Sequence, residues 1–238
     1  MASQEVIVNV ARFGNELNLR LKVPSTKYLD EFIGLKCAPT LLQTGYFPNA
    51  KEITETIGGF RPVQSLLQSL FGDPRVVVLV VGDGHTPRTG AMFAVRTRWK
   101  VYSIDPSTSH EGDLKIRNLH VVKSKVEDFI PPKDVERIVI VGVHSHGPID
   151  GLWNFYSSLG VPRMAVAIPC CFDLGKGMPY PNQDYQDWNI WSPERRVMVW
   201  YNGRTASNVP DLSSEKRGRS IVDPTPHTRD SWVLPQAS

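Results

Sequence analysis

Glycines and acidic residues follow two apolar runs of the sequence, at residues 75–81 and 100–104. Glycine lets the backbone come close to a bound molecule, and a carboxylate that closes the next strand can accept hydrogen bonds from both hydroxyls of a ribose. The acid follows the first glycine by 23 positions (105 − 82). The expected ligand-binding residues are Gly82, Asp83, Gly84, Asp105 and Pro106. The alternative is that the glycines only form a tight turn between a strand and a helix.

The spacing of the glycines separates the classes of ligand. A dinucleotide-binding loop has the pattern G-x-G-x-x-G, whereas this loop has Gly82, Gly84 and then Gly90. A phosphate-binding P-loop carries Lys and Ser or Thr after its last glycine, and here Ala91 and Met92 follow. The loop therefore matches neither of these phosphate-binding patterns.

Histidines follow the apolar run at 137–143, and the run at 164–170 ends in a cysteine pair, Cys170 and Cys171. Histidine titrates near neutrality, so His144 and His146 are the expected catalytic residues, which would position an acceptor or take its proton. A second interpretation is a divalent metal site. Two histidines at i and i+2 of an extended strand face one side, and Asp150 with Cys170 or His85 could complete the ligand set.

The pattern resembles the class I S-adenosylmethionine-dependent methyltransferases over residues 60–202, because a strand, a short G-x-G and an acid closing the next strand occur in that order. The resemblance implies S-adenosyl-L-methionine as the cofactor and methyl transfer as the reaction. An H-x-x-G after the fourth run and a Cys-Cys after the fifth are similar to a branch that includes transfer-RNA 2′-O-methyltransferases. The matching positions are His144, Gly147, Cys170 and Cys171. RNA is therefore the favoured acceptor, ahead of a small molecule or a protein.

Two positions depart from the methyltransferase pattern. The acid usually found two residues before the first glycine is Val80, and the acidic position often seen after the third strand is Lys125. A binding module that kept the fold and lost its chemistry is accordingly the second hypothesis. A metal-dependent hydrolase built on His144, His146 and Asp150 is the third.

The elements that position these residues are predicted to form an α/β fold. Five apolar runs, at 75–81, 100–104, 119–124, 137–143 and 164–170, alternate with turns or helices, which is typical of parallel strands buried on both faces. Residues 187–191 and 195–202 are predicted to form an antiparallel pair at the sheet edge. The prediction is a doubly wound, mostly parallel, seven-stranded Rossmann-like sheet, the ligand site lying at the carboxyl ends of its strands.

An N-terminal extension precedes this sheet. Alternating residues on both sides of Gly14 and Asn15 predict a β-hairpin extension, and short helices are expected to end near residue 35 and to span about 49–57. The expected organisation is an extension at 1–59, a methyltransferase-like domain at 60–202 and a mostly disordered polar tail at 203–238.

Composition bounds the class of protein. The chain has 238 residues, 41% of them hydrophobic, and a net charge of +3, which suits a globular protein and says little about partners. Three cysteines exclude a disulfide framework, and neither a signal peptide nor a membrane span is predicted, so we expect an intracellular protein in a reducing compartment. Aromatic residues between 178 and 191 could stack a base of RNA or DNA, and RNA is the suggested partner.

Overall fold

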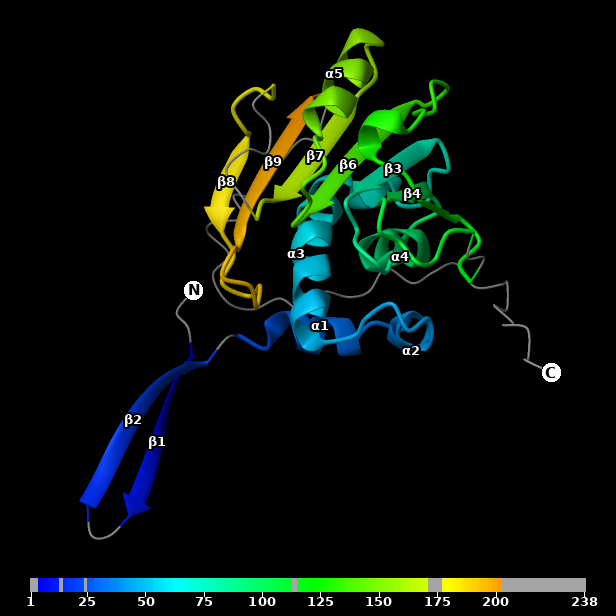
Figure 1. Ribbon diagram of the computed structural model, residues 1–238. Coiled ribbons are helices and arrows are strands. Elements are labelled where there is room, and N and C mark those ends of the chain that lie inside the picture. The colour runs from blue at the N-terminus through cyan, green and yellow to red at the C-terminus, as the bar shows by residue number, and fades with distance from the viewer. Residues whose placement is uncertain (1–3, 13–14, 24, 113–114, 171–176, 203–238) are drawn as a thin grey trace, which may run out of the picture.

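The computed structural model describes residues 4–12, 15–23, 25–112, 115–170 and 177–202 (Figure 1). Its first element is the predicted hairpin, formed by β1 (Gln4–Arg12) and β2 (Asn15–Val23) and projecting away from the rest of the chain. The antiparallel register runs from Gln4 opposite Val23 to Arg12 opposite Asn15. Asn15 therefore belongs to the second strand rather than to the turn. The predicted tail at 203–238 lies outside the described residues.

Three helices lead from the hairpin to the sheet: α1 (Lys27–Ile33), α2 (Ala38–Gln43) and α3 (Ala50–Leu67). Asn49 caps α3, because its side chain accepts a hydrogen bond from the backbone N–H of Glu52 at 3.1 Å. The helix continues through Gly58 and Gly59, where the sequence predicts a break. A Cβ on Gly59 would lie 2.8 Å from Cγ2 of Val143, so the glycine serves close packing of the helix on the sheet.

Seven strands form one sheet in the order β5-β4-β3-β6-β7-β9-β8. The bounds are β3 (Val76–Val81), β4 (Lys100–Ile104), β5 (Leu119–Val122), β6 (Arg137–Val143), β7 (Arg163–Ile168), β8 (Gln183–Gln186) and β9 (Arg196–Asn202). The first five are mutually parallel, and β9 lies antiparallel between β7 and β8. The predicted seven-stranded, mostly parallel Rossmann-like sheet is confirmed.

The edge strand β8 begins earlier than the sequence predicts. Residues 187–191, expected to be a strand, form a turn that starts at Asp187. The carboxylate of Asp187 accepts hydrogen bonds from the backbone N–H and the side-chain amide of Asn189, and the N–H of Ile190 bonds to the carbonyl of Asp187. This turn lies at the same end of the sheet as the carboxyl end of β7, because β8 runs parallel to β7.

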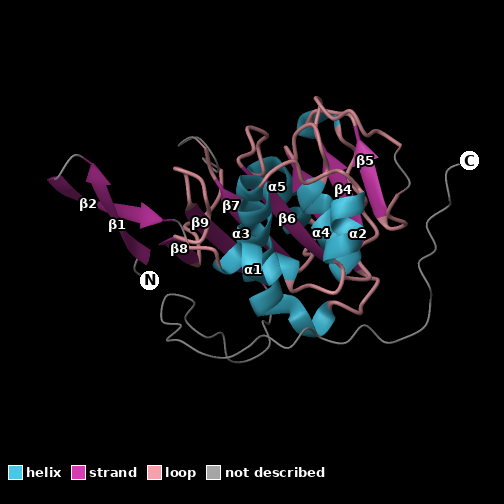
Figure 2. Cartoon of the chain, turned by 90° about the horizontal axis from the view of Figure 1, so that it is seen from below, coloured by secondary structure: helices cyan, strands magenta, loops and turns pink. Residues whose placement is uncertain are grey.

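Helices cover both faces of the sheet, as a doubly wound fold requires (Figure 2). Alternate residues of β3 belong to two separate cores: Val76, Val78 and Val80 pack on the side of α1 to α4, and the residues between them on the side of α5. The bounds of the last two helices are α4 (Arg88–Arg96) and α5 (Asp150–Ser158). Short 3-10 turns occur at Gln68–Leu70 and Val126–Asp128. Among the described residues, no helix combines the length and apolarity needed to cross a bilayer.

Candidate functional site

The glycine loop after β3 touches the ends of both neighbouring strands. Gly82 has a φ of 66°, and its N–H donates to the carbonyl oxygen of Ile104 at 2.8 Å. A Cβ on Gly82 would lie 2.3 Å from Oγ of Ser145, in the loop after β6. Glycine is therefore required here both by the left-handed backbone and by the close approach of the next loop. The predicted loop thus joins the carboxyl ends of β3, β4 and β6.

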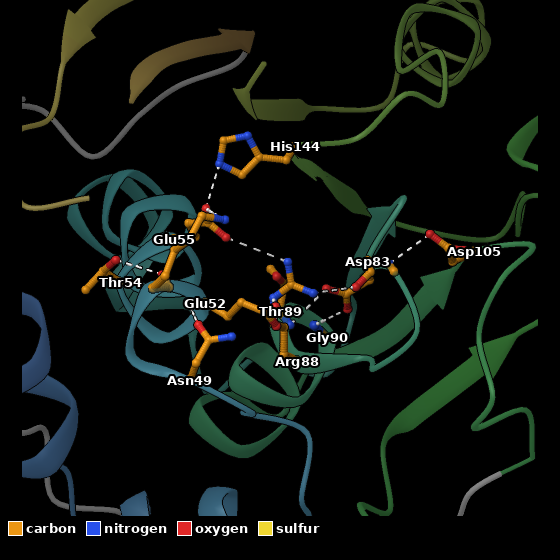
Figure 3. Close-up of polar contacts among 12 residues, drawn as sticks. Asn49, Glu52, Thr54, Glu55, Asp83, Arg88, Thr89, Gly90, Asp105 and His144 are labelled. Atoms are coloured by element: carbon orange, nitrogen blue, oxygen red, sulfur yellow. Dashed lines mark hydrogen bonds and ion pairs between the residues drawn. The ribbon is translucent and has the colours of Figure 1, made fainter. Parts of the chain in front are cut away.

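Asp83 is buried and caps α4. Its two carboxylate oxygens accept hydrogen bonds from the backbone N–H groups of Thr89 and Gly90 and from the hydroxyl of Ser103, at 2.9–3.0 Å (Figure 3). Burial raises the pKa of Asp83, against the lowering effect of nearby Arg88 and of these hydrogen bonds. The side chain of Asp83 thus ties the glycine loop to the start of α4. Only the backbone of Asp83 is left to contact a ligand at the loop.

Asp105 closes β4 and reaches back to the glycine loop. One carboxylate oxygen accepts the N–H of Gly84 at 2.8 Å, and the other accepts both the N–H and the hydroxyl of Ser107. Gly84 has a φ of 80°, a conformation that glycine adopts readily. The structure therefore brings Gly82, Gly84 and Asp105 together, as predicted, with the side chain of Pro106 exposed beside them.

The occupied start of α4 restricts the ligand. In dinucleotide-binding folds a pyrophosphate sits on the free N–H groups at the start of this helix. Here two of those N–H groups are bonded to the carboxylate of Asp83, whose negative charge also faces the positive end of the helix dipole. The site therefore suits a nucleoside-type ligand without phosphate better than a nucleotide.

The two predicted histidines do not share a site. Nε2 of His144 lies 3.0 Å from Oε1 of Glu55 on α3, with angles outside the hydrogen-bond range (Figure 3). His146 is exposed, and its Nε2 lies 3.4 Å from Sγ of Cys170 after β7. The i, i+2 geometry of a regular strand is lost because His144 has a left-handed φ of 51°. The rings therefore contact different partners.

A metal site built on His144 and His146 would need both rings to face one ion, and here they contact different residues. Within the described ranges, no three side chains among His, Cys, Asp and Glu are grouped as a metal site would need. Cys171, the second member of the cysteine pair, lies outside those ranges.

Charged residues gather around the buried carboxylate of Glu55, and this charged cluster was not found from the sequence; its members are Lys51, Glu52, Glu55, Arg88 and His144. Nζ of Lys51 lies 2.6 Å from Oε1 of Glu55, whose side chain is 1% exposed. Arg88 lies between α3 and the glycine loop, with Nε 3.3 Å from Oε2 of Glu52 and Nη1 donating to the carbonyl of Asp83 at 2.9 Å. Burial raises the pKa of Glu55, but contacts with His144 and Lys51 outweigh it, so the pKa lies below its ordinary value.

One signal in the sequence points to Glu55. The residue lies one helical turn before Gly58 and Gly59, the small residues that face the sheet, so a carboxylate stands on the buried side of α3. An acid on a buried helix face needs a partner, and that requirement predicts a basic group opposite.

The aromatic residues near β8 divide into anchored and exposed ones. Trp191 is anchored, because its backbone N–H donates to Oγ1 of Thr54 and its indole N–H to the carbonyl of Ser25. Tyr180 is 98% exposed and Trp188 50% exposed. The guanidinium of Arg195 lies 4.5 Å from the centre of the Trp188 ring. Two aromatic faces and a cation are thus accessible.

Comparison with known proteins gives distant likenesses only. No protein-family model and no curated protein matches the chain. Among solved structures, MtNAS in complex with S-adenosylmethionine is 12% identical, with 73% of this chain and 70% of that chain covered at a TM-score of 0.42.

Two other solved structures are of named enzymes. Mycolic acid cyclopropane synthase CmaA1, complexed with SAH and CTAB, is 19% identical (45% and 41% covered, TM-score 0.33). Coclaurine N-methyltransferase, bound to N-methylheliamine and SAH, is 12% identical (60% and 45% covered, TM-score 0.35). This chain spans less than half the length of these two enzymes. Likenesses this distant leave the function to be decided by the residues of the site.

Proposed function

We propose that this protein binds S-adenosyl-L-methionine at the carboxyl ends of β3 and β4 and transfers its methyl group to an acceptor. One observation carries the proposal: the carboxylate of Asp83 fills the phosphate position at the start of α4, while the carboxylate of Asp105 stands at the end of the next strand. A ligand with a ribose and no phosphate fits this combination. S-adenosyl-L-methionine is such a ligand.

Each predicted residue then has a defined part. Gly82 and Gly84 supply backbone that can approach the adenosine, and Asp83 holds that backbone against the start of α4. Asp105, with neighbouring Pro106, contacts the ribose. The bound cofactor would supply an electrophilic methyl group. His144 and His146 follow β6 and are the residues proposed to orient the acceptor and to take its proton.

RNA is the proposed acceptor. The support is the pair of exposed rings, Tyr180 and Trp188, with Arg195 against the second. Aromatic side chains stack on unpaired bases, and a guanidinium adds attraction for phosphate. Trp188 lies in the turn after β8, at the same end of the sheet as His144.

Isothermal titration calorimetry tests cofactor binding. S-adenosyl-L-methionine should bind, whereas NAD and ATP should not, because their phosphates meet the occupied start of α4. Asp105→Asn should weaken binding about tenfold or more, since a hydrogen bond to a charged group is worth ~1.5–3 kcal/mol. Asp184→Asn, which alters an exposed carboxylate paired with Arg196, is the matched control and should bind normally. Equal binding by Asp105→Asn and the control would refute the assignment of this site.

Transfer of label from S-adenosyl-[methyl-³H]methionine tests the reaction and the acceptor. We expect label in total cellular RNA, and less of it with Trp188→Ala than with Trp188→Phe, which keeps an aromatic face. Label in protein or in small molecules instead would overturn the RNA acceptor while keeping methyl transfer. Tight cofactor binding with no labelled acceptor would favour the non-catalytic binding module.

A further inference from the structure

We infer that Glu55 is a positioning residue, which holds the imidazole of His144 in the tautomer that is protonated on Nε2 and leaves Nδ1 free to take a proton from the acceptor. The inference rests on the proposed methyl transfer and deepens it. It assigns separate parts to the two histidines, because the exposed ring of His146 contacts Cys170 whereas the ring of His144 faces Glu55.

The contact itself is the first observation. Oε1 of Glu55 and Nε2 of His144 lie 3.0 Å apart, and both atoms are buried. A carboxylate only accepts hydrogen bonds, so the nitrogen that faces it must carry the proton. Figure 3 shows the second ring nitrogen on the side of the imidazole away from Glu55. The angles are not yet those of a hydrogen bond, which is common at catalytic sites without their substrates.

The backbone of His144 is the second observation. It is the one described residue other than glycine with a positive φ, at 51°. L-residues occupy this region at a cost, and such conformations cluster at functional sites. The N–H of His144 donates to the carbonyl of Ile168 at 2.8 Å, which holds the residue beside β7. A glycine would adopt this backbone conformation without strain, so the imidazole of His144 stands here at a cost in backbone energy.

The charges around Glu55 are the third observation. From α3, Lys51 contacts the same oxygen that faces His144, and from α4, Nη2 of Arg88 lies 3.8 Å from the other oxygen. Glu52 contacts Arg88 as well. Two carboxylates and two cations therefore balance before His144 is counted. A proton that arrives on His144 is stabilised by a carboxylate whose ionisation these cations maintain.

This arrangement narrows the class of acceptor. The attacking atom of the acceptor forms the new bond to the methyl carbon, and the electron pair of the broken carbon–sulfur bond leaves with sulfur. The proton lost by the acceptor goes to Nδ1 of His144 and from there to water. A base so placed serves a hydroxyl or an N–H group, and a thioether or tertiary amine, which has no proton to lose, does not need it.

The test is ¹⁵N NMR of the histidine side chains in the cofactor-free protein, with His144→Ala used to assign the resonances of this ring. Long-range ¹H–¹⁵N correlations distinguish a protonated from an unprotonated ring nitrogen. At a pH where the ring is neutral, the unchanged protein should show His144 protonated on Nε2 alone. Glu55→Gln, which keeps the shape but can donate as well as accept, should show a mixture of the two tautomers. Glu52→Gln, the matched control, removes a carboxylate that contacts Arg88 but not His144 and should leave the tautomer unchanged.

Three results would overturn the inference: protonation on Nδ1 in the unchanged protein, no response to Glu55→Gln, or the same response to Glu52→Gln. The first is read on the unchanged protein and does not depend on the folding of either glutamate variant. Calorimetry with S-adenosyl-L-methionine is run on the unchanged protein, on Glu55→Gln and on Glu52→Gln. A mixture of tautomers in Glu55→Gln, together with unchanged binding of S-adenosyl-L-methionine, supports the inference. A fixed tautomer in a protein that binds no S-adenosyl-L-methionine would remove the methyltransferase proposal but leave the pairing of Glu55 and His144 standing.

Discussion

Replacement of Asp83 separates a structural carboxylate from one that contacts a ligand. In Asp83→Ala, the N–H groups of Thr89 and Gly90 and the hydroxyl of Ser103 lose their common acceptor. A buried donor left unpaired costs ~1–3 kcal/mol, and loss of a helix cap costs ~0.5–2 kcal/mol. Removal of a buried charge offsets part of this, and the hydroxyl of Ser103 can rotate toward another acceptor. We therefore expect a loss of about 2–4 kcal/mol in the free energy of unfolding.

Urea denaturation measures this loss at constant m-value. Asp83→Asn keeps one acceptor oxygen and should lose about half as much, since each remaining hydrogen bond to the helix is worth ~1 kcal/mol. Asp184→Ala removes an exposed ion pair with Arg196 and should change stability by at most ~1 kcal/mol. If Asp83→Ala is as stable as this control, the carboxylate does not hold the start of α4.

The pH dependence gives an independent check. Burial raises the pKa of Asp83 in the folded protein, so between the unfolded value of ~3.9 and the folded one the native state binds more protons than the unfolded state. The stability that this residue contributes is therefore fully present below the unfolded pKa and falls as pH rises through the folded pKa. The difference in stability between the unchanged protein and Asp83→Asn should shrink over that window. A difference that grows with pH would contradict the assignment of the raised pKa.

Two further predictions concern Asp105 and His144. Ser107→Ala removes both a hydroxyl donor and its competition for Asp105, so calorimetry should find S-adenosyl-L-methionine binding about 2- to 10-fold tighter, equivalent to a competing hydrogen bond of ~0.5–1.5 kcal/mol. Weaker binding would mean that the hydroxyl itself contacts the cofactor. His144→Gly should be more stable than His144→Ala by about 1 kcal/mol, because only glycine relieves the left-handed backbone. Equal denaturation midpoints would show that the backbone relaxes when the imidazole is removed.

The parts of the fold that follow from local pattern were predicted. The buried runs that become β3 and β6 are continuous apolar segments of strand length, and a parallel sheet follows from their alternation with helices. Gly84 and Asp105 were predicted to follow two strands of one sheet, and they lie in contact because the carboxyl ends of neighbouring parallel strands meet at one edge. These inferences need only the pattern of apolar residues along the chain and the handedness of the connections between strands.

The parts that depend on tertiary contacts were not predicted. Gly58 and Gly59 suggest a helix break when read locally, yet they lie inside α3, where a Cβ on either residue would lie within 2.8 Å of a side chain. The contact between Glu55 and His144 joins residues from different elements, and no local pattern links them. The start of β8 was misplaced because the aromatic residues at 188 and 191 favour a strand locally, whereas Asp187 forms a turn there. Contacts across the fold override local preference at each of these points.

The contacts of α1 and α3 with the turn after β8 set an order for assembly. Tyr28 donates to the carboxylate of Asp187 across 159 residues, and Trp191 donates to Ser25 across 166. In a chain made from its N-terminus, the surface that seats Glu55 is synthesised long before the strands against which it rests. His144 and Glu55 therefore meet only after β6 has been synthesised, and α3, which carries Glu55, bonds to the turn after β8 only once residue 191 has been synthesised. A ribosome-bound chain that ends before the last strand pair holds every predicted cofactor-binding residue but lacks the turn that fastens α3 over them.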